Sequence, residues 1–246
     1  TNFRYASTSM NAFKSAGVAL RAAVLVAALG FHAGAALAGP QMYEPLSASA
    51  RHALQKAVSD QAVEGTSFES QEQARTWILA MSRRLHRQLP DAVARIELLR
   101  TVHYEATRAG LDPQLVLAVI QVESNFPKYA VSTAGARGYM QVMPFWVDLI
   151  GTKDHNLFHL RTNLRYGCLI LRHYLDIERG NLTRALGRYN GSLGKLWYPS
   201  LVQTAWKSAW QYEAPESAGV VTVVDRAQAP ATRVTPVSAA ATVLRR

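Results

Sequence analysis

The feature that most constrains the fold is an aliphatic run, residues 115–120, which follows a clear helix start. Asp112 is suited to cap the free N–H groups of a helix, and Pro113 suits the first helical position, where its missing N–H is not needed. The run that follows, Leu-Val-Leu-Ala-Val-Ile, leaves no polar face. A helix that is apolar nearly all round is buried, so we expect this helix at the centre of the domain.

One carboxylate ends this apolar helix. Glu123 lies seven residues after Val116 and three after Ile120, so the helical repeat places it on their face, together with Val119. Burying an unpaired carboxylate costs several kcal/mol, roughly, and raises its pKa toward neutrality. A carboxyl group in that state is suited to act as a general acid. The plainer alternative is a solvated helix end or the partner of an ion pair.

Helical patterns also dominate the rest of the chain. Thr66 and Glu69 have the spacing of a capping box ahead of a helix that Pro90 ends. The next helix is predicted to begin at Asp91 and to end at Gly110. Helices are expected within residues 47–60, 66–89, 91–110, 112–123, 162–180, 181–190 and 196–210. We find no convincing strand pattern, although short extended segments could lie within the loop 127–143, so the predicted class is mainly α.

In the helix that begins at Asp91, we expect one face to carry the apolar contacts. The residues placed near that face are Val93, Ile96, Leu99 and His103.

The two ends of the sequence are predicted to lie outside the fold. After Met10, two basic residues (Lys14 and Arg21), a short apolar run and Ala36-Leu37-Ala38 have the order of a secretory signal peptide. We expect residues 1–38 to be this leader and the exported protein to be periplasmic; the alternative is an uncleaved membrane anchor. Residues 214–246, rich in Ala, Val, Thr and Pro, are predicted to form a disordered tail.

Charge and cysteine content limit the partners and cofactors. The formal net charge is +10, which favours anionic partners such as nucleic acid, an acidic membrane or a cell-wall polymer. The export signal argues against nucleic acid. Cys168 is the single cysteine, so neither an intramolecular disulfide nor a thiolate cluster can form. His155 and His159 lack the Glu of a His-Glu-x-x-His site, and we expect neither a metal nor another cofactor.

Three short motifs, in order, resemble the signatures of the soluble lytic transglycosylase catalytic domain. Glu123-Ser124 matches Glu-Ser, residues 138–141 (Gly-Tyr-Met-Gln) resemble Gly-Leu-Met-Gln, and residues 188–190 (Arg-Tyr-Asn) resemble Ala-Tyr-Asn. The resemblance covers about residues 100–210 and includes a later helix through Asn163 and Gly167. Tyr139 and Arg188 stand where the family has Leu and Ala.

This resemblance implies a mainly α, lysozyme-like domain of the goose-type lysozyme and transglycosylase kind. Residues 95–213 would form the catalytic domain, and residues 39–94 a helical N-terminal extension. The implied reaction cleaves the β-1,4 bond between N-acetylmuramic acid and N-acetylglucosamine in peptidoglycan. Glu123 would act first as acid and then as base, giving a 1,6-anhydro product. The expected partners are peptidoglycan glycan strands and, further, cell-wall or secretion machinery.

Candidate substrate contacts follow from the same resemblance. They are Ser124, Ser132, Gln141, Met143, Tyr189 and Asn190. We expect Tyr189 to place its hydroxyl near Glu123 and fix its orientation, and Asn190 to brace the loop that carries it. Four aromatic residues at helical spacings are expected to pack in the core instead: Trp197, Tyr198, Trp206 and Trp210.

Other functions remain open at the level of sequence. A muramidase would use the same acid and add water across the bond. A non-catalytic protein that binds glycan or assembles a secretion system would not need the acid at all. A helical domain that binds nucleic acid is favoured only by the charge.

Overall fold

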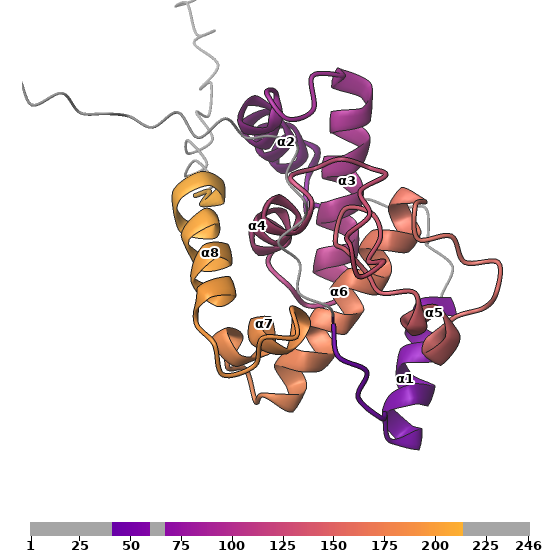
Figure 1. The fold of residues 1–246 in the computed structure, drawn as a ribbon. Coiled ribbons are helices and arrows are strands. Elements are labelled where there is room, and N and C mark those ends of the chain that lie inside the picture. Colours follow the sequence, from indigo (N-terminus) through magenta and orange to yellow (C-terminus); the bar gives the residue numbers. More distant parts are fainter. Residues whose placement is uncertain (1–40, 60–66, 214–246) are drawn as a thin grey trace, which may run out of the picture. The chain divides into compact units, whose positions relative to one another are not determined.

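The computed structural model describes residues 41–59 and 67–213, and this part of the chain is helical (Figure 1). Its elements are α1 (Ala48–Ser59), α2 (Gln71–Leu85), α3 (Ala92–Arg108), α4 (Pro113–Glu123), α5 (Phe145–Ile150), α6 (Leu160–Ile177), α7 (Leu182–Tyr189), α8 (Trp197–Ala205) and the π-helix η1 (Trp206–Trp210). Extended pairing in these residues is limited to isolated bridges of Arg137 with Val131 and Val142. The predicted mainly α class is confirmed, while the leader and the tail lie outside the described residues.

Helix α4 forms the centre, as its composition predicts. Residues 115–120 are all buried, and α4 packs against α3, α8 and η1. The Asp112 carboxylate caps the helix by accepting the Gln114 N–H at 2.7 Å, and Pro113 occupies the first turn. The sequence therefore determines both where this helix starts and where it lies.

The long helix α6 connects the centre to the loop 124–144. It packs against α3 and α7, and Cys168 is buried within it as a small apolar side chain. A Cβ at Gly167 would collide with the Met140 side chain, so only glycine lets the loop lie this close to the helix.

The start of α2 differs from the prediction. The helix begins at Gln71 with Ser70 as its cap, and the Ser70 hydroxyl accepts the Gln73 N–H at 3.1 Å. The Gln73 side chain in turn accepts the Glu69 N–H at 2.7 Å. The observed capping pair, Ser70 and Gln73, thus lies four residues after the expected pair, Thr66 and Glu69. Thr66 itself lies outside the described residues.

The buried face of α3 also differs from the prediction. Asp91 caps this helix as expected, accepting the Ala94 N–H at 2.8 Å, and Gly110 adopts the left-handed conformation after its end. Val93, however, is 78% exposed and Ile96 lies at the surface. Leu99 is buried as expected. The other side chains that α3 buries are Arg95, Leu98, Val102, Glu105 and Ala106.

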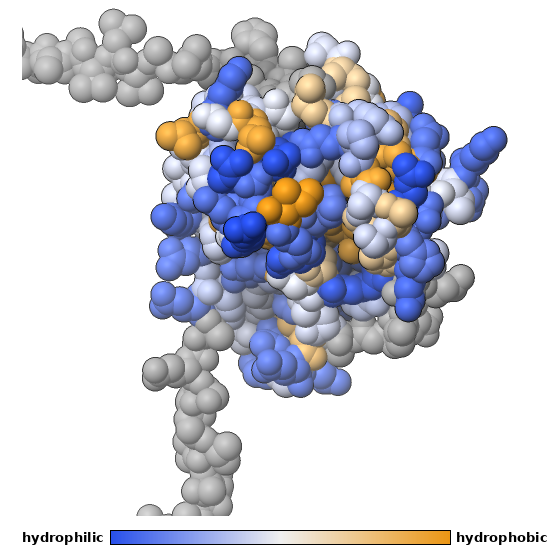
Figure 2. Space-filling model, turned by 90° about the horizontal axis from the view of Figure 1, so that it is seen from below, coloured by the Kyte–Doolittle hydropathy of each residue, from blue (hydrophilic) through white to orange (hydrophobic). Residues whose placement is uncertain are grey.

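The chain ahead of α1 is extended and runs beside elements far away in sequence. The indigo segment in Figure 1 leads into α1 past α6 and α7. Seen from below, apolar side chains form separate small areas in a largely hydrophilic surface (Figure 2). No helix within residues 41–59 and 67–213 has both the length and the apolar character required to cross a bilayer.

Candidate active site

Glu123 is buried at the end of α4, on the face predicted for it, with 2% of its surface exposed. Its Oε1 atom accepts a hydrogen bond from the Tyr198 hydroxyl at 2.5 Å. Its Oε2 atom is buried and has no hydrogen-bond partner among the described residues. Burial raises the pKa of Glu123 from 4.5 to about 8, and the Tyr198 hydrogen bond opposes part of that rise.

The tyrosine that bonds Glu123 is not the one expected. The hydroxyl of Tyr189 donates to the Met140 carbonyl at 2.7 Å, so it holds the loop rather than the carboxylate. Tyr198, on α8, supplies the hydroxyl at Glu123. Both tyrosines are buried. The sequence alone does not show which of the two hydroxyls reaches Glu123 at the end of α4.

Asn163 of α6 holds the loop that carries the second motif. Its Oδ1 accepts the Met140 N–H at 2.8 Å, and its Nδ2 donates to the carbonyls of Arg137 and Leu157. Gly138 has a φ of +74° and lies so close to Asn163 that a Cβ would collide with the amide. Only glycine therefore lets the backbone lie this close to the Asn163 side chain.

Two candidate residues present buried amide atoms without hydrogen-bond partners. Gln141 is 1% exposed; its Nε2 donates to the carbonyls of Gly138 and Ala130, while its Oε1 has no partner among the described residues. Asn190, directly after α7, is also 1% exposed, and neither side-chain atom finds a partner there. Buried polar atoms in folded proteins are nearly always hydrogen-bonded, so these atoms are suited to bind a polar ligand.

The two candidate serines make hydrogen bonds inside the loop. The Ser124 hydroxyl donates to the Tyr139 carbonyl at 2.8 Å, which ties the end of α4 to the second motif. The Ser132 hydroxyl accepts the Ala136 N–H at 3.0 Å within the turn. Both side chains thus shape the loop next to Glu123.

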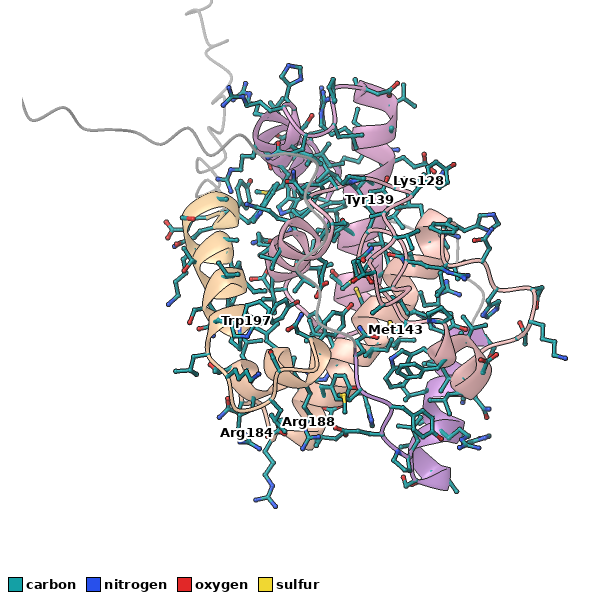
Figure 3. The ribbon with its side chains drawn as sticks, in the orientation of Figure 1. Lys128, Tyr139, Met143, Arg184, Arg188 and Trp197 are labelled. Atoms are coloured by element: carbon teal, nitrogen blue, oxygen red, sulfur yellow. The ribbon has the colours of Figure 1, made fainter. Side chains whose placement is uncertain are left out.

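Met143 is the remaining candidate, and it reveals a contact that the sequence did not indicate. Met143, labelled in Figure 3, is half-buried, and its backbone N–H donates to Oε1 of Gln41 at 3.3 Å. The two residues are 102 positions apart, and neither periodicity nor a motif relates them. Gln41 and Tyr198 are the two polar residues at the site that sequence reasoning missed.

The aromatic set is divided between core and surface. Tyr198 and Trp210 are buried as expected, and the Trp210 ring N–H donates to the Gln121 side chain at 2.6 Å. Trp197, expected in the core, is 42% exposed, with its ring edge-on to Tyr198. Trp206 is half-buried.

The two histidines of residues 155–159 lie in a turn and at the start of α6. His155 hydrogen-bonds the Tyr166 hydroxyl through Nδ1 at 2.7 Å. In the part of the chain that the structure describes, no group of three or more His, Cys, Asp or Glu side chains is arranged to hold a metal ion.

The arrangement around Glu123 can move a proton. With a pKa near 8, the group is mostly protonated at neutral pH and can still give up its proton. Its Oε2 is free to interact with a ligand, while the Tyr198 hydroxyl fixes its Oε1. The site is therefore suited to general acid catalysis followed by general base catalysis at one carboxyl group.

Comparison with known proteins finds that this region is similar to a known family. The family model described as the transglycosylase SLT domain matches residues 100–210. A protein named transglycosylase from Enterobacteria phage PRD1 is 34% identical over 91 residues, which cover 37% of this chain and 33% of the phage protein. A protein named membrane-bound lytic murein transglycosylase C from Cronobacter sakazakii is 32% identical over 111 residues, 39% of this chain and 31% of that protein.

The similarity to a third relative is higher but shorter. The membrane-bound lytic murein transglycosylase C of Actinobacillus pleuropneumoniae serotype 5b is 48% identical over 48 residues, 20% of this chain and 13% of that protein. The chain thus spans a third or less of the length of these relatives. The matched region contains Glu123, the loop and residues 188–190. Residues 100–210 of this chain are therefore similar to the transglycosylase SLT domain.

Proposed function

We propose that this protein is a lytic transglycosylase that cleaves peptidoglycan glycan strands without adding water. The observation that carries the proposal is Glu123, a buried carboxyl group with a raised pKa, one oxygen bound by Tyr198 and the other free. The family of residues 100–210 and the names of the relatives support the same activity.

In the first step, Glu123 acts as the acid. Its proton passes to the oxygen that bridges N-acetylmuramic acid and N-acetylglucosamine, and the bond from muramoyl C1 to that oxygen breaks. The substrate's own 2-acetamido group stabilises the charge that develops at C1. The chemistry therefore needs one protein carboxyl group, whereas hydrolytic glycosidases usually need two.

In the second step, the same group acts as the base. The Glu123 carboxylate takes the proton of the muramoyl C6 hydroxyl, whose oxygen bonds to C1 and closes the 1,6-anhydro ring. Glu123 ends protonated, as it began, so the cycle requires no water molecule. A pKa near 8 suits both transfers, since neither protonation state is strongly favoured near neutral pH.

The other site residues divide into two roles. We assign Gln141, Asn190 and Met143 to substrate contact, because the two amides present unpartnered buried atoms and Met143 is half-buried two positions after Gln141. Ser124, Ser132 and Tyr189 hold the loop through their own hydrogen bonds. Tyr198 orients the acid.

Digestion of purified peptidoglycan tests the function. The wild type should release products lighter by one water than those of a muramidase, as read by mass spectrometry. Glu123→Gln keeps the size and the acceptor for Tyr198 but holds no transferable proton, so release should fall at least about 100-fold. Asp148→Asn, which removes an exposed carboxylate on α5, is the matched control and should retain activity.

Two results would contradict the proposal. Products that carry an added water would assign the protein as a muramidase. Undiminished release by Glu123→Gln would remove Glu123 from the mechanism.

We also propose that the protein acts in the periplasm. The predicted leader precedes the described residues, and two of the three relatives compared are named as membrane-bound. N-terminal sequencing of the exported protein checks this, with cleavage expected between Ala38 and Gly39. An intact leader on membrane-associated protein would instead assign residues 1–38 as an anchor.

A further inference from the structure

The extended segment ahead of α1, residues 41–46, crosses from one part of the candidate site to another; we call it the N-terminal strap. Gln41 contacts Met143, which ends the loop of the second motif. Glu44 contacts Arg188, which begins the third motif. Between them, the Tyr43 ring packs edge-on against Phe145 at 5.8 Å between centroids. Figure 3 labels Met143 and Arg188, the two residues that the strap contacts through Gln41 and Glu44.

Gln41 is the part of the strap that enters the site. It is 5% exposed although it lies in a segment without regular structure. Its Oε1 accepts the Met143 N–H, and its Nε2 faces the Tyr189 hydroxyl but lies beyond hydrogen-bond distance of it. Its Nε2 is buried and makes no hydrogen bond to the described residues. A buried amide donor without a partner is costly unless something binds to it.

Several buried polar atoms without hydrogen-bond partners lie in the strap, at the end of α4, in the loop 124–144 and directly after α7. They are Nε2 of Gln41, Oε2 of Glu123, Oε1 of Gln141, both amide atoms of Asn190 and Oγ of Ser192. This set mixes donors and acceptors, which is the complement that sugar hydroxyl and acetamido groups require. Gln41 contributes a donor from outside the family domain, which begins at residue 100.

The strap is held by an ion pair. The Nη1 atom of Arg188 donates to both oxygens of Glu44, at 2.8 and 2.9 Å, and the same guanidinium pairs with Glu178 at the end of α6. The Arg188 side chain is 19% exposed and that of Glu44 is 42% exposed, so solvent screens this pair in part. We call the Glu44–Arg188 pair the latch. The latch gives a role to Arg188, which stands where the family that this chain resembles has Ala.

We propose that Gln41 is a further glycan-binding residue, which donates through Nε2 to a sugar oxygen and is held in place by the latch. The inference rests on the proposed function. It makes the strap part of the substrate site, and it assigns Arg188 as a positioning residue that acts through Glu44 and Gln41.

The test measures binding and cleavage separately in the full chain. Binding to insoluble peptidoglycan is measured in the Glu123→Gln background, where no cleavage interferes. Gln41→Ala should weaken binding about fivefold, as expected for one hydrogen bond. In the active protein the same change should raise KM by a similar factor with little change in kcat. Met42→Ala, on the same strap but with a side chain that is 59% exposed, is the matched control and should bind as the parent does.

The latch is tested by a double-mutant cycle. Glu44→Ala should weaken binding because Gln41 is then no longer held. The double variant, Gln41→Ala with Glu44→Ala, should bind no worse than Gln41→Ala alone. If the two residues acted independently, their losses of binding free energy would add. The thermal midpoint of each variant is measured alongside, so that a loss of fold is distinguished from a loss of binding.

Three outcomes overturn the inference. One is unchanged binding by Gln41→Ala in a folded protein, and another is additive loss in the cycle. The third is faster cleavage by Gln41→Ala, which would make the strap a cover over the site. Failure of the proposed function is a separate result, since it would appear as the absence of anhydro products from the wild type itself.

Discussion

At the scale of single residues, two opposing effects set the proton affinity of Glu123. Burial disfavours the carboxylate, while the Tyr198 hydroxyl donates a hydrogen bond that favours it. The first effect is larger, so the group is protonated at neutral pH. The second keeps the pKa near 8, which suits the later base step of the proposed reaction.

Tyr198→Phe should shift the pH dependence of cleavage. Without the hydroxyl, the carboxylate loses its hydrogen bond, so the pKa of Glu123 rises above about 8. The alkaline limb of kcat/KM should move to higher pH, while kcat falls about tenfold because the acid is no longer oriented. Rates measured between pH 5 and 10 provide the check.

Tyr189→Phe is the control for this shift. Its hydroxyl bonds the Met140 carbonyl, so its loss should disturb the loop without moving the alkaline limb upward. An equal shift in both variants would show that Tyr198 has no specific effect on Glu123.

At the scale of elements, the sequence predicts a helix best where residues close together in the chain determine its start and its burial. Asp112, Pro113 and the aliphatic run determine the start and the burial of α4, and with them the environment of Glu123. Helix α5 was missed because six residues are too few to show a helical period. The buried face of α3 was misjudged because Arg95 and Glu105 are buried with polar partners, which an apolar pattern cannot reveal.

The site itself was predicted only in part, for a related reason. Motif order brought Glu123, Gln141 and Asn190 into one proposal. The hydroxyl at Glu123 and the amide of Gln41 instead come from segments 75 and 102 positions away from their partners. Contacts of this kind depend on how α8 and the strap pack, and no local pattern encodes them.

The contact between α6 and the loop gives a prediction at this scale. Gly167→Ala improves the helix propensity of α6 by about 1 kcal/mol, but the new Cβ collides with Met140. Overpacking of this kind costs about 1–3 kcal/mol, so a net loss of stability is expected, together with lower activity because Met140 precedes Gln141. Denaturant unfolding and the cleavage rate check both effects.

Gly187→Ala in α7 is the comparison. A Cβ there would lie 3.3 Å from Leu193 Cα, a tight approach that a small shift relieves. Equal stability losses in the two variants would contradict the specific role given to the Met140 contact.

At the scale of the whole molecule, the raised pKa of Glu123 links stability to pH. The folded pKa of about 8 lies above the ordinary value of 4.5, so between these values the folded state binds more protons than the unfolded state. The contribution of Glu123 to the free energy of unfolding is therefore fully present below pH 4.5 and is lost as the pH rises to 8. The loss is on the order of a few kcal/mol.

Glu123→Gln should accordingly gain stability relative to the wild type as the pH rises. The difference between their free energies of unfolding should be small near pH 4 and reach its full size near pH 8. His103, whose pKa burial lowers to about 4, is present in both proteins, so its titration cancels from the difference. Urea titrations across this range provide the measurement, and a difference that stays constant with pH would contradict the buried state of Glu123.

The Glu44–Arg188 pair spans 144 positions, so it closes a loop that contains most of the described polypeptide. Such long-range closure is entropically unfavourable until intervening helices have already docked. Assembly should therefore proceed from the aliphatic interior outward, with the amino-terminal residues settling last. A truncated protein that begins after Leu46 would retain its interior yet lack Gln41 and Glu44, which sets a practical lower limit on how far the chain can be shortened if the proposed role of the strap holds.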